Sequence, residues 1–195
     1  ESSTEDFASL LGNLSVENVT YNAADIQTSG KINLSDTTEE NSIGNLLIGS
    51  GNLTIETLYA ANLTNDGTLS TKTVTVTQNI TNNSEITSDT VLANNDLENN
   101  GKLNAATSVQ ANNITNAGEI TTPTLIANSE LSNAENATIT ATNGSITVGT
   151  NLTNDGTLST KTIIVTQNIT NDGSMNVATT NVGGNLIDNG TWNSD

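Results

Sequence analysis

A period of seventeen residues runs through most of this chain of 195 residues. The phrase asparagine–aliphatic–threonine–asparagine, or a close variant, recurs at that spacing, with one longer interval of twenty-one residues. The segment "NLTNDGTLSTKTVTVTQNIT" at 62–81 therefore returns almost unchanged at 151–170 as "NLTNDGTLSTKTIIVTQNIT". A fixed period of this length is typical of repeat proteins, in which each unit is one coil of an array. The aliphatic residue of the phrase is Leu63, Ile80, Leu97, Ile114, Leu131, Leu152, Ile169 or Leu186.

Within each period, the apolar residues follow the alternation of β-strands. A second aliphatic residue comes six positions after the first, as Leu69 follows Leu63, and a third cluster has apolar residues two apart, as in Val74 and Val76. Such alternation buries one face of a strand, whereas no apolar pattern persists at helical spacing. The sequence predicts an all-β, single-stranded parallel β-solenoid with about seventeen residues and three short strands per coil. Each strand pairs with its counterparts in the coils before and after.

The composition suits a repeat array better than a single globule. Only 33% of the residues are hydrophobic and 2% aromatic, which is low for a globular core. In a solenoid, stacked neighbours join narrow apolar seams into one continuous core. We expect the array to span residues 23–195 and residues 1–22, which break the repeat, to cap its N-terminal end. Corner insertions are expected near 35–42 and within 134–146, where Ile139 and Ile146 keep their columns while two extra residues bulge at each of two corners.

One asparagine recurs at the end of the first strand of each coil. A side-chain amide both donates and accepts hydrogen bonds, so stacked amides can bond along the rod and satisfy turn backbone that would otherwise be buried unpaired. The alternative, a row of ligand-binding amides, requires that the side chains be exposed. The predicted ladder comprises Asn65, Asn82, Asn99, Asn116, Asn133, Asn154 and Asn171.

Glycine recurs two residues after the ladder asparagine, in turns such as "NDG". Glycine adopts a left-handed backbone at little cost, so the sequence predicts that conformation at this column. Ser84 replaces glycine in one coil and is expected to be slightly strained. The turn glycines are Gly67, Gly101, Gly118, Gly156, Gly173 and Gly190.

Charge narrows the classes of partner. The chain has 21 acidic residues, four lysines and no histidine, for a formal net charge of -17. Nucleic acid and anionic membrane surfaces are therefore excluded as partners, because both are held by clustered basic residues. No apolar stretch approaches the ~20 residues of a membrane span, so no membrane insertion is expected. Stacking is expected to place Lys102 between Glu85 and Glu119, and Lys72 beside Asp89.

Catalytic chemistry has few candidate residues. Histidine, cysteine and arginine are absent, which removes the usual general base, thiol nucleophile and anion anchor. Carboxylate pairs suit a glycosidase, but the few aromatic residues are spread thinly along the chain. Aspartates in the "NDG" turns suit weak surface calcium binding at most. We expect no enzyme, no catalytic residue, no cofactor and no metal site.

The repeat "NLTNDGTLSTKTVTVTQNITNNSEI" resembles the filamentous-haemagglutinin type found in secreted passengers of Gram-negative autotransporters and two-partner exoproteins. The resemblance covers nearly all of residues 23–195, although the coil here is shorter than is usual in that family. It implies a right-handed β-helix at the bacterial cell surface or in the extracellular space. Its function would be that of a non-catalytic stalk or adhesin module whose partner is a host or neighbouring-cell receptor or glycan.

Two alternatives remain open. One is a self-assembling extracellular filament subunit that stacks end to end. The other is a β-helix that binds or cleaves glycans, or a phage-type tail fibre.

Overall fold

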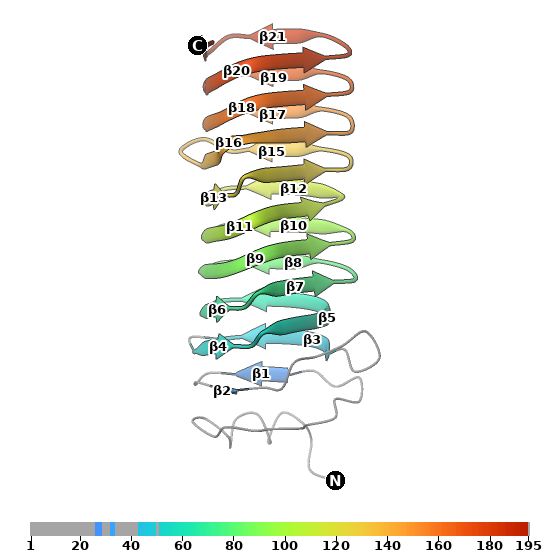
Figure 1. Ribbon diagram of the computed structural model, residues 1–195, viewed down its shortest axis with the longest axis vertical. Helices are drawn as coiled ribbons and strands as arrows, with labels where there is room; N and C mark the ends of the chain where they lie inside the picture. The colour runs from blue at the N-terminus through green and yellow to red at the C-terminus, as the bar shows by residue number, and fades with distance from the viewer. Residues whose placement is uncertain (1–25, 29–31, 34–42, 50, 195) are drawn as a thin grey trace.

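The computed structural model describes residues 26–28, 32–33, 43–49 and 51–194. These residues form a parallel β-solenoid of about nine turns, in which the coils stack along one axis into a rod (Figure 1). All described strands belong to one sheet in which every pairing is parallel, and no helix occurs among the described residues. The fold class predicted from the period is therefore confirmed.

The strands are short where they form one face of a coil and longer where they continue around a corner. Their bounds are β1 (Ile26–Thr28), β2 (Ile32–Asn33), β3 (Ile43–Ile48), β4 (Asn52–Thr54), β5 (Thr57–Asn65), β6 (Thr68–Ser70), β7 (Thr73–Val76), β8 (Ile80–Asn82), β9 (Glu85–Ala93), β10 (Asp96–Asn99), β11 (Lys102–Ala111), β12 (Asn113–Asn116), β13 (Glu119–Thr121), β14 (Thr124–Ala127), β15 (Leu131–Asn133), β16 (Thr138–Val148), β17 (Leu152–Asn154), β18 (Thr157–Val165), β19 (Ile169–Asn171), β20 (Ser174–Val182), β21 (Leu186–Asp188) and β22 (Thr191–Asn193).

Register between coils follows the sequence period. Leu97 pairs with Ile80 in the coil before it and with Ile114 in the coil after it. Like residues therefore lie directly over one another. This register follows from burial, because a slip by one residue would turn every apolar side chain of a strand outward.

Each coil has three faces, but the prediction of three separate strands holds only in part. β6 and β7 are separate, as are β13 and β14, whereas β9, β11, β16, β18 and β20 each cover the second and third faces as one bent strand. Between β9 and β11 the register shifts at the corner between Ala105 and Ser108. The bend therefore accommodates an extra residue while the ladder resumes beyond it.

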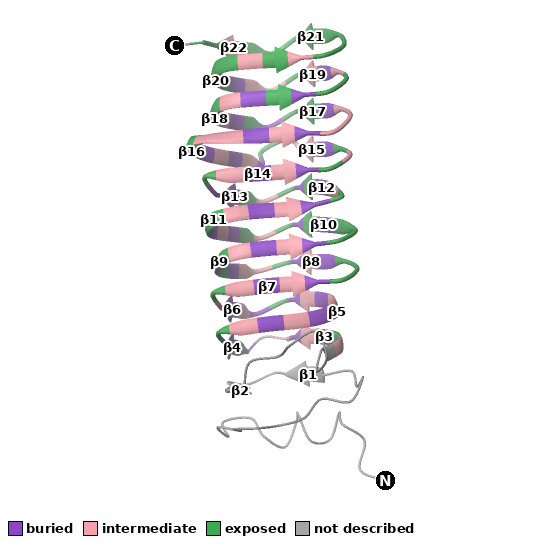
Figure 2. Ribbon diagram, turned by 45° about the vertical axis from the view of Figure 1, so that its right-hand side comes forward, coloured by how far each residue is buried: buried purple, intermediate pink, exposed green. Residues whose placement is uncertain are grey.

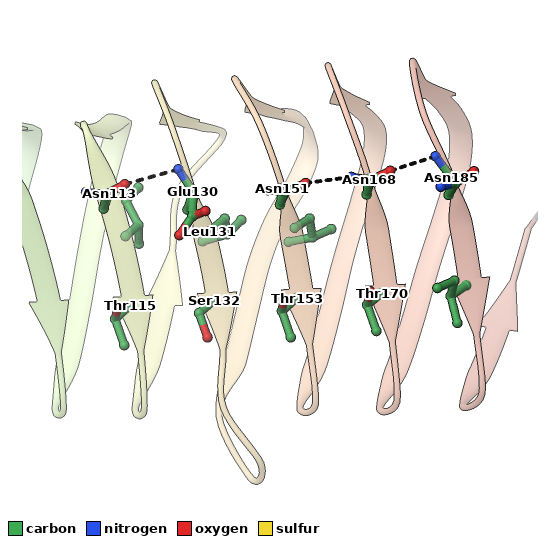
Figure 3. Close-up of a pocket in the computed structure, with 13 residues that line it drawn as sticks. Asn113, Thr115, Glu130, Leu131, Ser132, Asn151, Thr153, Asn168, Thr170 and Asn185 are labelled. Atoms are coloured by element: carbon green, nitrogen blue, oxygen red, sulfur yellow. Dashed lines mark hydrogen bonds between the residues drawn. The ribbon is translucent and has the colours of Figure 1, made fainter.

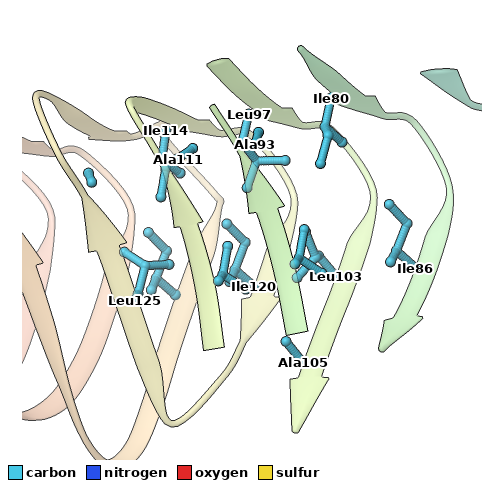
Figure 4. Packing of buried hydrophobic residues seen from close by; sticks show 14 of the residues in the cluster. Ile80, Ile86, Ala93, Leu97, Leu103, Ala105, Ala111, Ile114, Ile120 and Leu125 are labelled. Carbon is cyan, nitrogen blue, oxygen red and sulfur yellow. The ribbon is translucent and has the colours of Figure 1, made fainter. Parts of the chain in front are cut away.

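The core is a set of apolar columns that run along the rod axis. Figure 4 shows Ile80, Leu97 and Ile114 stacked in one column and Ile86, Leu103 and Ile120 in another. These side chains are at most 1% exposed. Full burial of an aliphatic side chain contributes roughly 1.5–3 kcal/mol, so each coil depends on its neighbours to cover its seam. In the last coil, β21 and β22 are largely exposed (Figure 2), and Leu186 is 47% exposed.

The longer interval in the period consists of two corner insertions. Ile139 pairs with Ile120 and Leu158, and Ile146 pairs with Leu125 and Ile163, so both keep their columns. The first insertion lies between β15 and β16 and projects from the rod (Figure 1). The second lies between Ala141 and Ser145, where the register shifts.

Both insertions share a backbone feature. Asn136 in the first (φ 66°) and Asn143 in the second (φ 56°) are the only non-glycine residues with positive φ among the described residues. Asparagine tolerates this left-handed conformation better than most residues, which suits it to a tight bulge. The predicted cap at 1–22 and the predicted insertion at 35–42 lie outside the described residues.

Candidate functional site

The ladder asparagines form one hydrogen-bonded column inside the rod. Each donates from Nδ2 to Oδ1 of the asparagine in the next coil, over 2.7–2.8 Å, from Asn65 up to Asn171. Asn171 donates in turn to Asp188 over 2.6 Å. All seven asparagines are 0% exposed. These amides are not accessible to a ligand, so a row of binding groups does not fit this column.

The second hydrogen of each amide bonds turn backbone. Asn99 Nδ2, for example, also donates to the carbonyl oxygens of Gly101 (3.1 Å) and Glu119 (3.0 Å). The column thus satisfies both the buried amides and the carbonyl groups of the turns. It begins abruptly at Asn65, because Ile48 occupies the equivalent position in the coil before it. Asn65 Oδ1 consequently has no hydrogen-bond partner, and it is the only such buried side-chain atom in the described part of the chain.

The turn glycines correct one prediction. All six lie at the bends after the ladder strands, but no glycine among the described residues has a positive φ, so the predicted left-handed backbone is wrong. The reason for glycine is instead the close approach of successive coils. A Cβ built on Gly101 would overlap the carbonyl oxygen of Ser84, and one on Gly118 would overlap that of Gly101. Ser84 likewise lacks a positive φ, so no left-handed strain arises there.

A column of small polar residues at the corner between the second and third faces was missed from the sequence. Ser88 and Thr160 are buried, at 4% and 8% exposed, and each hydroxyl group lies within hydrogen-bond distance of two backbone carbonyl oxygens. Thr122 makes a similar bond to the Thr124 carbonyl oxygen over 3.1 Å. Alanine or valine takes the place of these residues in other coils. The column therefore has no single residue type that recurs at the seventeen-residue period.

The outer surface of the first face carries two polar columns with a shallow groove of about 550 Å3 between them. Figure 3 shows Asn113, Glu130, Asn151, Asn168 and Asn185 on one side, joined in part by hydrogen bonds. The other side carries Thr115, Ser132, Thr153 and Thr170. Glu130 is the only carboxylate in the lining. The groove therefore offers amides and hydroxyl groups to a polar ligand but no pair of carboxylates for acid–base chemistry.

Lys102 and Lys72 lie beside acidic residues of neighbouring coils, as expected, but form fewer ion pairs. Lys102 is paired in the ladder with Glu85 and Glu119, yet the described residues contain one ion pair, between Lys72 and Glu56. Lys72 was expected to lie beside Asp89, and the Asp89 amide does donate to the Lys72 carbonyl oxygen over 3.0 Å. However, Lys72 forms its ion pair with Glu56, which lies in the coil before it, whereas Asp89 lies in the coil after it.

No group of three or more histidine, cysteine, aspartate or glutamate side chains in the described ranges is arranged to hold a metal ion. Within those ranges, no helix has the length and apolar character needed to cross a bilayer.

Comparisons of the chain with protein-family models, with curated proteins and with solved structures found no match. The repeat architecture accordingly stands on the period of the sequence and on the coil-to-coil pairing of the structure.

Proposed function

We propose that this chain is a non-catalytic stalk or adhesin module of a bacterial surface or secreted protein. The observation that carries the proposal is the unbroken stacking of like residues along the rod, with an apolar core and a buried amide ladder shared by successive coils. In such an array each coil contacts only its neighbours, so length and stiffness scale with the number of coils. A protein that must hold a binding surface away from a cell needs these two properties.

Surface location is tested on intact cells of the source organism with an antibody against this chain, after brief protease treatment. We expect cleavage of the chain before lysis while a cytoplasmic control protein stays intact. Detection of the chain only after lysis would overturn the proposal.

The role as a stalk is tested by shortening the rod in whole coils. Deletion of residues 80–113 removes two periods and joins Asn79 to Ile114, which restores the column register. We expect a folded rod shorter by about 10 Å, from two strand spacings of ~4.8 Å, measured by small-angle scattering. Deletion of 80–105 serves as an out-of-register control that should lose cooperative folding. A stable, unshortened 80–113 deletion variant would argue against coil-wise construction.

A second candidate is a subunit that stacks end to end into filaments. Leu186 and Ile187 are 47% and 51% exposed in the last coil, and a further coil placed there would cover Leu186. Electron microscopy of the purified chain distinguishes fibres from separate rods. If fibres form, Leu186→Lys should suppress them; fibres that persist in this variant would exclude stacking through this end.

A further inference from the structure

A small polar pocket lies beside the second corner insertion. It has a volume of about 300 Å3 and lies over β16, β18 and β20. Its floor is the outward face of the second strands, where Thr140, Ser159 and Asn176 stack in register. Thr142 and Asn143 of the insertion form part of its wall. Ala178, in the coil after Lys161, presents only a methyl group there, which leaves space open above the lysine.

The pocket holds a positive charge without a counter-charge. Lys161 lines it, and no aspartate or glutamate does. The one ion pair of the described residues involves Lys72 and Glu56, so Lys161 belongs to none. In a chain of net charge -17, most of the surface repels anions. Lys161 therefore marks a place where a single negative group is tolerated.

The wall of the pocket is braced by contacts with both neighbouring coils. The Ser145 amide donates to the Pro123 carbonyl oxygen over 3.0 Å, and a Cβ on Gly144 would overlap that oxygen, so the insertion packs closely on the coil before it. From the coil after it, Thr160 Oγ1 donates to the Gly144 carbonyl oxygen over 3.2 Å. A pocket whose walls are already held in place loses less entropy when a ligand binds.

We propose that this pocket binds a monosaccharide unit that carries a carboxylate, as in an acidic glycan. The volume lies at the lower end of the range for small-molecule sites. Hydroxyl groups of threonine and serine and amides of asparagine can both donate to and accept from sugar hydroxyl groups, and Lys161 matches one carboxylate. A phosphate dianion fits less well, because phosphate sites generally combine several cationic or backbone N–H donors.

The pocket would supply the adhesin of the preceding subsection with its ligand, and in that sense it rests on the proposed function. Binding can nevertheless be measured on the purified chain, independently of where cells place it. If no binding is measured, only the proposed ligand site is refuted. If the chain is not exposed on cells, the proposed function is refuted, but the proposed ligand site is not.

The experiment is a titration of the isotope-labelled chain with glucuronate and galacturonate, followed by amide chemical shifts. Without an aromatic ring to stack on, we expect dissociation constants on the order of millimolar. Shifts should be confined to the backbone near Asn143, Lys161 and Asn176. Lys161→Gln should weaken binding by about fivefold, as suits an exposed charge pair, while Lys72→Gln, at the matching position of the other copy of the repeat, should leave it unchanged.

Shape is tested separately by deletion of Thr142 and Asn143, which leaves Gly144 opposite Lys161, much as neighbouring coils turn this corner without an insertion. The variant should remain folded, with nearly unchanged thermal stability, and should lose the uronate response. Glucose and galactose, which lack the carboxylate, should bind more weakly than the uronates by a similar factor of about five. An equal response to acetate or inorganic phosphate, an affinity that Lys161→Gln leaves unchanged, or no response to either uronate would each overturn the proposal.

Discussion

The two near-identical segments, 62–81 and 151–170, place like residues on the same faces of their coils but have different surroundings. Lys72 in the first and Lys161 in the second follow the same "TLST" phrase. Lys72 stacks on Glu56 and pairs with it, whereas Lys161 stacks beside the corner insertion and lines a pocket. Likewise, Asn65 begins the amide ladder above Ile48, while Asn154 lies in its middle, between Asn133 and Asn171.

This comparison shows that a repeat residue takes its energetic role from the coils before and after it. Identical letters specify the same face of the coil and the same inward or outward direction. Whether the side chain completes a ladder, forms an ion pair or lines a pocket depends on residues about one period away, which differ between the two copies. Matched substitutions in the two copies therefore measure the contribution of the neighbours directly.

The largest difference is expected in the ladder. Asn154→Leu removes the acceptor of Asn133 and leaves Asn171 Oδ1 buried without its donor, at a cost of about 2–4 kcal/mol. Asn65→Leu removes Asn65 Oδ1, which already lacks a hydrogen-bond partner, and leaves Asn82 Oδ1 as the buried oxygen without a donor. The number of such oxygens stays the same, so we expect a cost of about 1 kcal/mol. Urea denaturation of both variants measures the difference. Equal costs would show that the ladder bonds contribute independently of their neighbours.

A smaller difference is expected at the corner threonines. Thr160 is 8% exposed, and its hydroxyl group holds the Gly144 carbonyl oxygen of the insertion. Thr160→Val should cost about 1–2 kcal/mol, because it leaves buried carbonyl groups without a donor. Thr71 makes the matching bonds to Glu56 and Thr73 from a half-buried position, so Thr71→Val should cost about half as much. Thermal unfolding of both variants measures the two losses of stability. A greater loss for Thr71→Val than for Thr160→Val would contradict this prediction.

The comparison can be sharpened by giving Asn65 the neighbour that Asn154 has. Ile48→Asn places an amide donor next to Asn65 Oδ1 and loses the burial of one isoleucine, so opposing effects of about 1–3 kcal/mol nearly cancel. Ile80→Asn, which puts the same change in an apolar column, should destabilise the rod severely and serves as the control. In a double-mutant cycle, Asn65→Leu should cost at least about 1 kcal/mol more in the Ile48→Asn background than in the original chain. No coupling would contradict the proposed extension of the ladder.

The smallest difference is expected for the two lysines. The side chains of Lys72 and Glu56 are 67% and 56% exposed, and exposed ion pairs contribute little after screening by solvent and salt. Lys72→Gln should lower stability by at most about 0.5 kcal/mol, an effect that high salt removes. Lys161→Gln should leave the denaturation midpoint unchanged. A larger loss for Lys161→Gln would reveal an ion pair that the structure does not contain.

The sequence was sufficient for the fold and its register. Alternating apolar residues specify which side chains face inward, and a seventeen-residue period specifies which residues stack, so Leu97 could be placed between Ile80 and Ile114 from the letters alone. The corner insertions were also predictable, because Ile139 and Ile146 keep their phase on either side of the extra residues. Each of these features depends on chain spacing, which is a property of the sequence.

Contacts between coils were decided only by the tertiary structure. Glycine at the turns suggested a left-handed backbone. The structure shows instead that a Cβ there would overlap a carbonyl oxygen of the coil before. The distance between two coils cannot be read from the residues of one turn. The ion-pair partner of Lys72 and the pocket beside Lys161 depend likewise on how neighbouring corners pack. The sequence by itself determined whether each residue faces inward or outward and which residues stack. Only the tertiary structure decided which atoms are in contact, because contacts between coils depend on small differences in the distances between their atoms.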